Sequence, residues 1–578
     1  MKAHVLAFLA VVAAFAWCYG PGLGHGFSSD DFVMLEYSRV TSAAEIVRER
    51  LLRGPRTDVA SPWWRPGWLL VLNAGYEGFG MRPAAWRAAL WTLHLLVAAL
   101  VCRVAWRATA HRGLAVAAAA LFAVSPAYAE ALLWISAATN VLPAALCLLV
   151  AALAWARAVE GGARAARLVA WAAFLLSFLF REAAYHMPLV VCAAQCTLAP
   201  ALPLRRRVAA GVLHALPFGA VVVLHNVLLN PFTVGELSLG ENLAVAARHG
   251  IAWLHELFAL PARGTAALGA LAAFAVWFWR ASPRVRFCLA WAAAASFPFV
   301  VRSHETRFLY FAHTPLALAC ALTFADSRRV ARAGTLVLLA LAALNATRVP
   351  AKVRAGAEAA AVNDSFLVAA DDPRFAGAGT VHVDLLPPEL ANGAREMLAL
   401  RLGRDVEVVQ HLLLEERPPF LIFGNPAFPD LPGAQPMLHF ARATRRFART
   451  TKDELVAGRP VVPLLAFRHV VRTVDDWAEV RFDPAVVHLK PPLPDLDLTG
   501  EGTAKVVWVR AGTVQRFDVG VDVPRDGYLV VAFVAELTAI GGRAFVDGAP
   551  APLLVADGLF NAVPVRRGSR EVVIKASP

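Results

Sequence analysis

Long apolar stretches fill the chain from about residue 3 to residue 348, whereas charged residues and prolines recur every few positions from about residue 350 onward. An α-helix needs roughly 20 apolar residues to cross a hydrocarbon core about 30 Å thick. We therefore predict about 11 membrane-spanning helices, at residues 3–20, 88–106, 113–128, 137–156, 168–181, 183–200, 208–228, 264–280, 287–301, 308–325 and 333–348. Residues 66–79 are predicted as a half-buried or re-entrant helix.

The composition supports a membrane protein. Of the 578 residues, 58% are hydrophobic and only 17% are charged, which is too apolar for a soluble protein of this length. We predict a polytopic α-helical membrane protein with a soluble C-terminal region of α/β and β-sandwich structure. The predicted domains are a transmembrane core at residues 1–348, a small α/β region at 349–478 and a β-sandwich at 479–578.

The β-sandwich prediction rests on short strand-like runs at residues 505–509, 528–534, 543–546 and 571–575. Asp-Gly and Gly-Gly turns separate them, as in hairpins. The segments around residues 528–530, 544–548 and 559–568 are similar to the β-sandwich that ends several bacterial membrane glycosyltransferase-like proteins. A Pro-Gly-Trp motif usual before the Asp-Gly turn is missing, so we expect a structural or acceptor-facing module.

The first apolar run, residues 5–19, also fits a cleaved signal peptide, and Cys18 fits a lipoprotein. Trp17 is too bulky for the small residue that a peptidase needs before the cut, so we expect an uncleaved first helix. All seven cysteines lie in or beside apolar stretches without CxxC spacing. We therefore expect no zinc site, and no disulfide bond in the C-terminal region.

Arg and Lys clusters lie on alternate loops between the predicted spans, at residues 2, 103–112, 157–167, 205–207, 280–286 and 328–332. Cytoplasmic loops are rich in these residues, so the N-terminus is predicted inside. An odd number of spans then places the C-terminal region in the periplasm of a bacterium, with the chain in the cytoplasmic (inner) membrane. The net charge of +13 is therefore topogenic, and no nucleic acid is expected as a partner.

Ionisable residues collect in the loops predicted on the outer face. They are Asp30, Asp31, Arg65, Glu130, Arg181, Glu182, His186, Arg302, His304 and Arg307, the last just before Tyr310. Ionisable groups at membrane depth are costly and indicate a functional site by default. Carboxylates that activate a hydroxyl or hold a metal, with cationic groups that bind a leaving phosphate, suit transfer from a lipid-linked phosphate donor.

Structural alternatives stay open for most of these residues. A solvated loop or a helix cap is the alternative for Asp30, Asp31 and Glu130. Ion pairs are the alternative for Arg181 with Glu182 and for Arg302 or Arg307 with Glu305. Buried or interfacial positions are the alternative for His186 and His304, and an interfacial aromatic belt is the alternative for Trp63 and Trp64.

The same motifs, in this order, resemble the GT-C superfamily of membrane glycosyltransferases and are similar to the protein O-mannosyltransferases and their bacterial relatives. The resemblance covers about residues 1–348. It rests on Asp30-Asp31, Trp64-Arg65-Pro66 with Asn73 and Gly80, His94, Ser125-Pro126 to Glu130, Arg181-Glu182 with Pro188, and Arg307 to Tyr310. Ser125 stands where relatives often have His, and Arg181 where Lys is common.

The resemblance implies transfer with inversion of a sugar from a polyprenyl-phosphate-linked donor to a protein, lipid or polysaccharide acceptor at the outer membrane face. Asp30 or Asp31 would activate the acceptor, and Glu130 would be a second acid near the reaction centre. The implied donor-phosphate binders are Arg65, Arg181, Arg302, His304 and Arg307, supported by Glu182, His186 and Tyr310. No cofactor is expected, and a required divalent metal is not favoured.

A non-catalytic membrane transporter, or a scaffold of cell-envelope glycoconjugate assembly, is the alternative function. A transporter should carry polar or charged residues near the middle of several spans. Here they crowd at one predicted face, which favours the enzyme.

Overall fold

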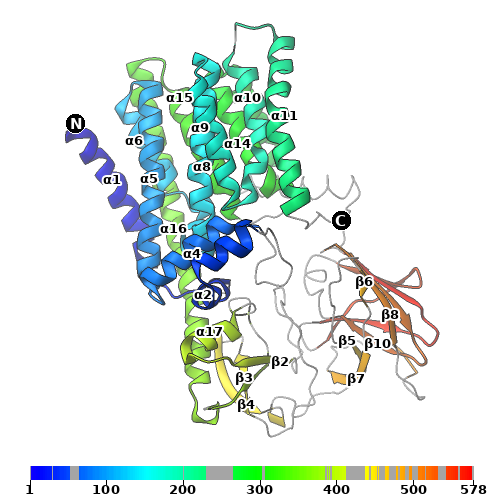
Figure 1. Ribbon diagram of the computed structural model, residues 1–578. Coiled ribbons are helices and arrows are strands. Elements are labelled where there is room, and N and C mark those ends of the chain that lie inside the picture. The colour runs from blue at the N-terminus through cyan, green and yellow to red at the C-terminus, as the bar shows by residue number, and fades with distance from the viewer. Residues whose placement is uncertain are drawn as a thin grey trace. The chain divides into compact units, whose positions relative to one another are not determined.

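The computed structural model describes residues 2–28, 30–52, 64–199, 201–229, 265–301 and 306–375, and in the C-terminal region residues 377–384, 387, 390, 393–411, 436–441, 444–451, 453–454, 462–467, 477–478, 482–487, 494–497, 505–513, 516–531, 542–556 and 560–575 (Figure 1). The chain divides into two compact units. The first comprises Met1–Phe27, Tyr37–Thr233 and Asn242–Glu358, and the second comprises Ser28–Glu36, Val234–Glu241 and Ala359–Pro578.

Each predicted span coincides with a helix of the first unit. In chain order these are α1 (Lys2–Tyr19), α5 (Pro83–Thr109), α6 (Arg112–Ala123), α8 (Ile135–Gly161), α9 (Arg164–Phe178), α10 (Met187–Leu198), α11 (Leu204–Leu229), α13 (Thr265–Arg280), α14 (Pro283–Val301), α15 (Leu309–Thr323) and α16 (Arg328–Ala370). Figure 1 shows α5, α8, α9, α10, α11, α14 and α15 running side by side as a bundle.

Four of the described helices are long and apolar enough to cross a membrane: Pro83–Thr109, Ile135–Gly161, Leu204–Leu228 and Arg328–Ala370. Large apolar side chains on the bundle surface are exposed, for example Leu168 (72%), Leu213 (66%) and Leu336 (70%). Such surfaces are rare on soluble monomers and are the surfaces that lipid tails cover. These features indicate a chain that spans a membrane. The number and orientation of the crossings stay predictions.

Helix boundaries follow local sequence. Pro66 opens α4 (Pro66–Phe79) and Pro83 opens α5, positions where the missing N–H of proline costs no helical hydrogen bond. The helix α8 ends at Gly161, and the next residue, Gly162, has a φ of 68° that suits glycine because it has no Cβ. The helix α16 continues beyond the predicted boundary at residue 348, and the compact units divide only at Glu358.

The amphipathic segment at residues 66–79 forms α4 as predicted, and α4 docks against the end of α9. The backbone N–H of Trp68 donates to the carbonyl of Leu179 at 3.1 Å. The indole N–H of Trp68 donates to Thr139 Oγ1 on α8 at 3.0 Å. In Figure 1, α4 lies crosswise to α5 and α8 at one end of the bundle. This docking brings the residue before α4, Arg65, to the loop that follows α9.

The second unit begins with a mixed four-stranded sheet in the order β2-β1-β3-β4. Its elements are β1 (Thr380–Asp384), α17 (Ala394–Leu402), β2 (Glu407–His411), β3 (Pro436–Ala441) and β4 (Arg446–Thr451). β1 pairs parallel with β2 and β3, and β3 pairs antiparallel with β4. Strands and a helix therefore both occur in the region predicted as α/β.

Two further sheets follow. The five-stranded sheet has the order β13 (Leu554–Ala556), β14 (Phe560–Val565), β10 (Gly527–Val531), β5 (Val462–Phe467), β7 (Phe482–Val487). The six-stranded sheet has the order β12 (Ala549–Ala551), β11 (Arg543–Val546), β15 (Glu571–Lys575), β9 (Arg516–Asp522), β8 (Lys505–Thr513), β6 (Trp477–Ala478). Because β5 and β6 pair with β10 and β8, the predicted domain boundary at 478/479 falls inside this set of strands.

The Asp-Gly turn between β11 and β12 has the expected conformation. Asp547 and Gly548 both have positive φ, 48° and 80°, as a two-residue hairpin turn that follows the strand twist requires. Val572 and Ile574 on β15 are fully buried and alternate with more exposed residues. The strand-like runs at residues 543–546 and 571–575 are thus strands, while face-to-face packing of the two sheets stays a prediction.

The contact between α4 and α5 gives a stability prediction with a matched control. A Cβ at Gly75 would lie 2.2 Å from the buried ring of Trp86, whereas a Cβ at Gly78 meets nothing within 4 Å. Gly75→Ala should destabilise the protein by about 1–3 kcal/mol because the ring cannot retreat. Gly78→Ala should be neutral or stabilising by up to about 1 kcal/mol. Melting of both purified variants in detergent tests this, and equal melting temperatures would contradict the packing.

Candidate active site

Charged residues predicted on one face do come together at one end of the helical bundle. Arg65 precedes α4, Glu182 opens the short helix η4 (Glu182–His186), Glu130 opens α7 (Glu130–Leu133) and Arg307 lies in η5 (Thr306–Phe308). Long apolar helices exclude charge from their middles, so charged residues fall at helix ends. Side-chain contacts then join these ends in pairs.

Arg65 and Glu182 form a bidentate ion pair. Arg65 Nε donates to Glu182 Oε1 at 2.8 Å, and Arg65 Nη2 donates to Glu182 Oε2 at 2.6 Å. Each side chain is only 11% exposed. The Arg65 guanidinium also lies 5.6 Å from the centre of the Trp68 ring. The alternative in which Glu182 pairs with its sequence neighbour Arg181 stays a prediction.

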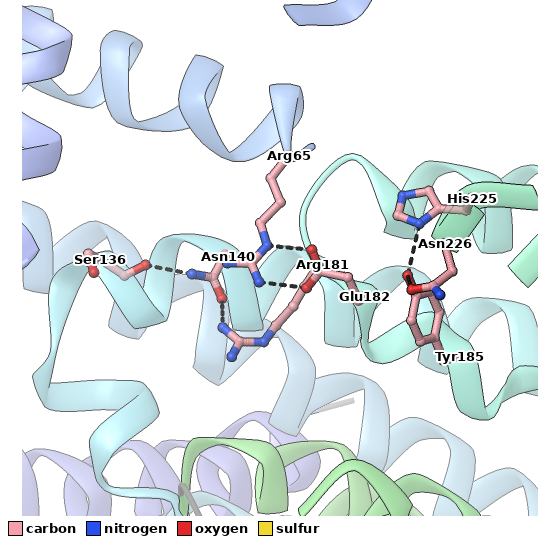
Figure 2. A network of polar contacts seen from close by, with 8 residues as sticks. All are labelled: Arg65, Ser136, Asn140, Arg181, Glu182, Tyr185, His225 and Asn226. Atoms are coloured by element: carbon pink, nitrogen blue, oxygen red, sulfur yellow. Dashed lines mark hydrogen bonds and ion pairs between the residues drawn. The ribbon is translucent and has the colours of Figure 1, made fainter. Parts of the chain in front are cut away.

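Arg181 contacts a neutral side chain on α8. Its Nη1 donates to the side-chain oxygen of Asn140 on α8, and Asn140 in turn donates to the carbonyl of Ser136 at 2.9 Å (Figure 2). The guanidinium lies 4.5 Å from the centre of the Phe308 ring, which is cation–π geometry. Arg181 is 4% exposed, so its charge is held by polar and aromatic groups in a low-dielectric setting.

Glu130 and Arg307 form the second ion pair. Arg307 Nη1 donates to Glu130 Oε1 at 2.6 Å. Glu130 Oε2 accepts from Thr306 Oγ1 at 3.0 Å and from the backbone N–H of Arg307 at 3.2 Å. The Arg307 guanidinium lies 4.6 Å from the centre of the Trp134 ring. Glu130 therefore contacts Arg307, and both of its oxygens accept hydrogen bonds.

Both signs of charge occur in these contacts. Among the described residues, the contacts bring together three guanidinium groups, on Arg65, Arg181 and Arg307, and two carboxylates, on Glu182 and Glu130. Burial alone would raise the pKa of Glu182, but the charge of Arg65, its hydrogen bonds and the charge of Arg181 hold the pKa below its usual range. The partners of Glu182 thus favour its ionised form.

His186 is a buried residue of η4. The side chain is 1% exposed, and its ring lies near that of Phe311 with a centroid distance of 6.4 Å. The structure therefore places His186 in packing contact with the start of α15.

Asp30 and Asp31 lie in the second compact unit, in the first turn of α2 (Asp30–Val40). Asp31 is 1% exposed, and its Oδ2 accepts from the backbone N–H of Ser28 at 3.0 Å. Asp30 is half-buried. Their position relative to Glu130 stays a prediction. Arg302, His304, Glu305 and Trp63 lie outside the described residues.

Sequence reasoning missed several residues that hold this site. Asn140 carries no charge and sits in an apolar helix, so nothing in the pattern singled it out. Arg87 on α5 is 2% exposed and donates to the carbonyls of Gly26 and Leu133, at 2.8 Å and 3.2 Å. An arginine near the start of an apolar stretch, well before the Arg cluster at residues 103–112, was the available signal.

No group of three or more His, Cys, Asp or Glu side chains is arranged to hold a metal ion in the part of the chain that the structure describes. The expectation that no divalent metal is required stays a prediction.

Comparison with known proteins gives a limited result. No protein-family model and no curated protein sequence matches the chain. Among solved structures, ArnT from Cupriavidus metallidurans bound to undecaprenyl phosphate is 16% identical and has a TM-score of 0.42, covering 70% of this chain and 85% of ArnT. ArnT in the apo state is 16% identical with a TM-score of 0.33, covering 71% and 86%. Both TM-scores are below 0.5.

Replacing Glu182 tests the first ion pair. Glu182→Gln should lower stability by about 3–5 kcal/mol at pH 7, because Arg65 then loses its anionic partner in a mostly buried position. The pKa of Glu182 is depressed, so the pair's contribution is present above the ordinary value of about 4.3 and disappears as pH falls through the native pKa. Melting in detergent should therefore show a large difference from wild type at pH 7 and a shrinking one below about pH 4.

The double variant Arg65→Gln with Glu182→Gln is the control, because it removes both charges. It should melt above the Glu182→Gln variant. Equal melting of wild type and Glu182→Gln at pH 7 would contradict the pair.

Proposed function

We propose that this chain is a membrane glycosyltransferase that moves a sugar from a polyprenyl-phosphate-linked donor to a protein, lipid or polysaccharide acceptor at the outer face of a bacterial inner membrane. The observation that carries the proposal is the gathering of Arg65, Arg181 and Arg307 at one end of an apolar helical bundle. Guanidinium groups beside an exposed apolar surface suit an anion that is attached to a lipid.

The donor's phosphate is the group that these arginines would bind. Guanidinium groups stay charged and offer planar forks of N–H donors that fit phosphate oxygens. In sugar transfer the bond between the anomeric carbon and the phosphate oxygen breaks, and the phosphate leaves with the electron pair. Positive charge fixed near that oxygen stabilises the negative charge that develops there. The exposed apolar helix surface would accommodate the polyprenyl chain.

Acceptor activation is assigned to Asp30. A single displacement with inversion needs one base that takes the proton from the acceptor hydroxyl as it attacks the anomeric carbon. Asp31 is 1% exposed and accepts from Ser28 N–H, which suits a residue that fixes the turn. Asp30 is half-buried and is the more accessible carboxylate of the two.

The resemblance implied that Glu130 is a second acid near the reaction centre, and we assign Glu130 a different role. Its two oxygens accept hydrogen bonds from Thr306 and Arg307. These donors fix the position of the Glu130 carboxylate beside Arg307. We propose that Glu130 orients Arg307 toward the donor phosphate.

Two single variants separate catalysis from folding at the acidic pair. Asp30→Asn should lower transfer about 10²–10⁴-fold because the general base is lost. Asp31→Asn should keep most of the transfer per folded molecule, with a stability loss of about 1 kcal/mol, because asparagine can still accept from Ser28 N–H. The measurement is the amount of the cell glycoconjugate that disappears on gene deletion, normalised to the amount of protein in the membrane.

Unchanged glycoconjugate with normally expressed Asp30→Asn would contradict the catalytic proposal. That result would instead favour a non-catalytic transporter or scaffold.

A further inference from the structure

A buried cluster of polar and aromatic side chains inside the bundle has no role in the proposed reaction. Its members are each at most 4% exposed: Tyr19, His94, Ser125, Tyr128, Tyr310 and His313. They come from α1, α5, the loop that leads into η3 (Pro126–Tyr128), and α15. Buried polar groups are costly unless they form hydrogen bonds, so their partners fix where these side chains lie.

His94 joins α5 to both neighbouring segments. Its Nε2 lies 3.2 Å from the carbonyl oxygen of Ala123, and its Nδ1 lies 2.9 Å from the hydroxyl of Tyr310. A carbonyl can only accept, so Nε2 carries the hydrogen, and Nδ1 then accepts from Tyr310. This neutral tautomer links the end of α6 to the first turn of α15.

Ser125 and His313 make a second link between the same two segments. Ser125 Oγ lies 2.9 Å from His313 Nε2 and accepts from the backbone N–H of Ala127 at 3.3 Å. From the other side, the hydroxyl of Tyr19 donates to the carbonyl of Ser125 at 2.8 Å. The rings of Tyr128 and Tyr310 meet edge to face, with centroids 4.8 Å apart. The turn at residues 125–128 is thus fixed against α15.

These two segments carry the two halves of one ion pair. Glu130 follows Ser125 by a few residues, and Arg307 comes one helical turn before Tyr310. Glu130 and Arg307 can keep their 2.6 Å contact only while both segments keep their relative position. A displacement of about 1 Å in a binding group can cost roughly 10²-fold in rate.

We propose that His94 and His313 are positioning residues that hold the turn carrying Glu130 against α15, and so fix Arg307 on Glu130. The geometric part depends only on the contacts above. Its consequence for the donor rests on the proposed function, in which Arg307 contacts the donor phosphate.

Hydrogen exchange on the purified full-length protein in detergent tests the geometric part without any ligand. In His313→Leu and in Tyr310→Phe, amides in residues 126–134 and 306–310 should exchange at least tenfold faster than in wild type. His313→Gln should restore slow exchange, because its amide reaches the position of Nε2. Ser177→Ala is the matched control: Ser177 is fully buried, and its hydroxyl bonds only Phe174 O in its own helix, at 2.6 Å. It should leave both segments unchanged.

Binding of undecaprenyl phosphate as a probe, followed by native mass spectrometry, tests the consequence. His313→Leu should weaken binding at least tenfold, His313→Gln should bind as wild type does, and His313→Leu should cause no further loss in an Arg307→Gln background. Unchanged exchange in His313→Leu would overturn the inference. Faster exchange with unchanged binding would also overturn it, since the histidines would then be merely structural.

Failure of the wild-type protein to bind the probe has a separate meaning. It would contradict the proposed function, while the exchange rates of His313→Leu and His313→Gln would still decide whether the histidines hold Glu130 on Arg307.

Discussion

Keeping guanidinium charge at the end of an apolar bundle is the constraint on which the rest of this site depends. An arginine held away from water needs anionic, polar or aromatic partners, because an uncompensated buried charge costs several kcal/mol. The structure supplies a different solution for each arginine: a bidentate carboxylate for Arg65, an amide and a phenyl ring for Arg181, and a carboxylate with an indole ring for Arg307. These contacts fix the positions of the short helices η4, α7 and η5, which carry the charged residues between the spans.

The same constraint connects the loops to the interior. Glu130 can neutralise Arg307 only if the turn before α7 keeps its place beside α15. The hydrogen bonds of His94 and His313 supply that placement from inside the bundle. Rigid support behind a binding group is what keeps it in productive geometry. The buried polar cluster around His94 and His313 is thus connected to the charged cluster at the end of the bundle.

The sequence predicted the helices well where length and apolarity decide the structure, as at residues 66–79, which form α4. It also predicted that Arg65, Arg181, Glu182 and Glu130 gather at one end, because charge is excluded from apolar spans. Partner choice was not predictable. Arg181 and Glu182 are neighbours, yet Arg181 has an extended backbone (φ −164°, ψ 148°) just before η4 begins, so the two side chains point to different partners (Figure 2).

Other differences have equally local causes. Asn140 is uncharged, so no pattern marked it as the partner of Arg181. In the late β region strand pairing joins distant segments: β5 pairs with β10, more than fifty residues later. A change in composition marks where an apolar sequence becomes a polar one. The hydrogen bonds between strands decide which segments belong to the same sheet.

The central claim is that the guanidinium groups at the end of the bundle bind a lipid phosphate, and the affinity of purified protein for undecaprenyl phosphate tests it most directly. Arg181→Gln, compared with the exposed control Arg284→Gln, should weaken binding about 10–100-fold, as expected for one lost charged hydrogen bond. Arg284 is 57% exposed and pairs with Glu160, so its loss should leave the affinity unchanged. Equal affinities of wild type, Arg181→Gln and Arg284→Gln, with all three folded, would contradict the account.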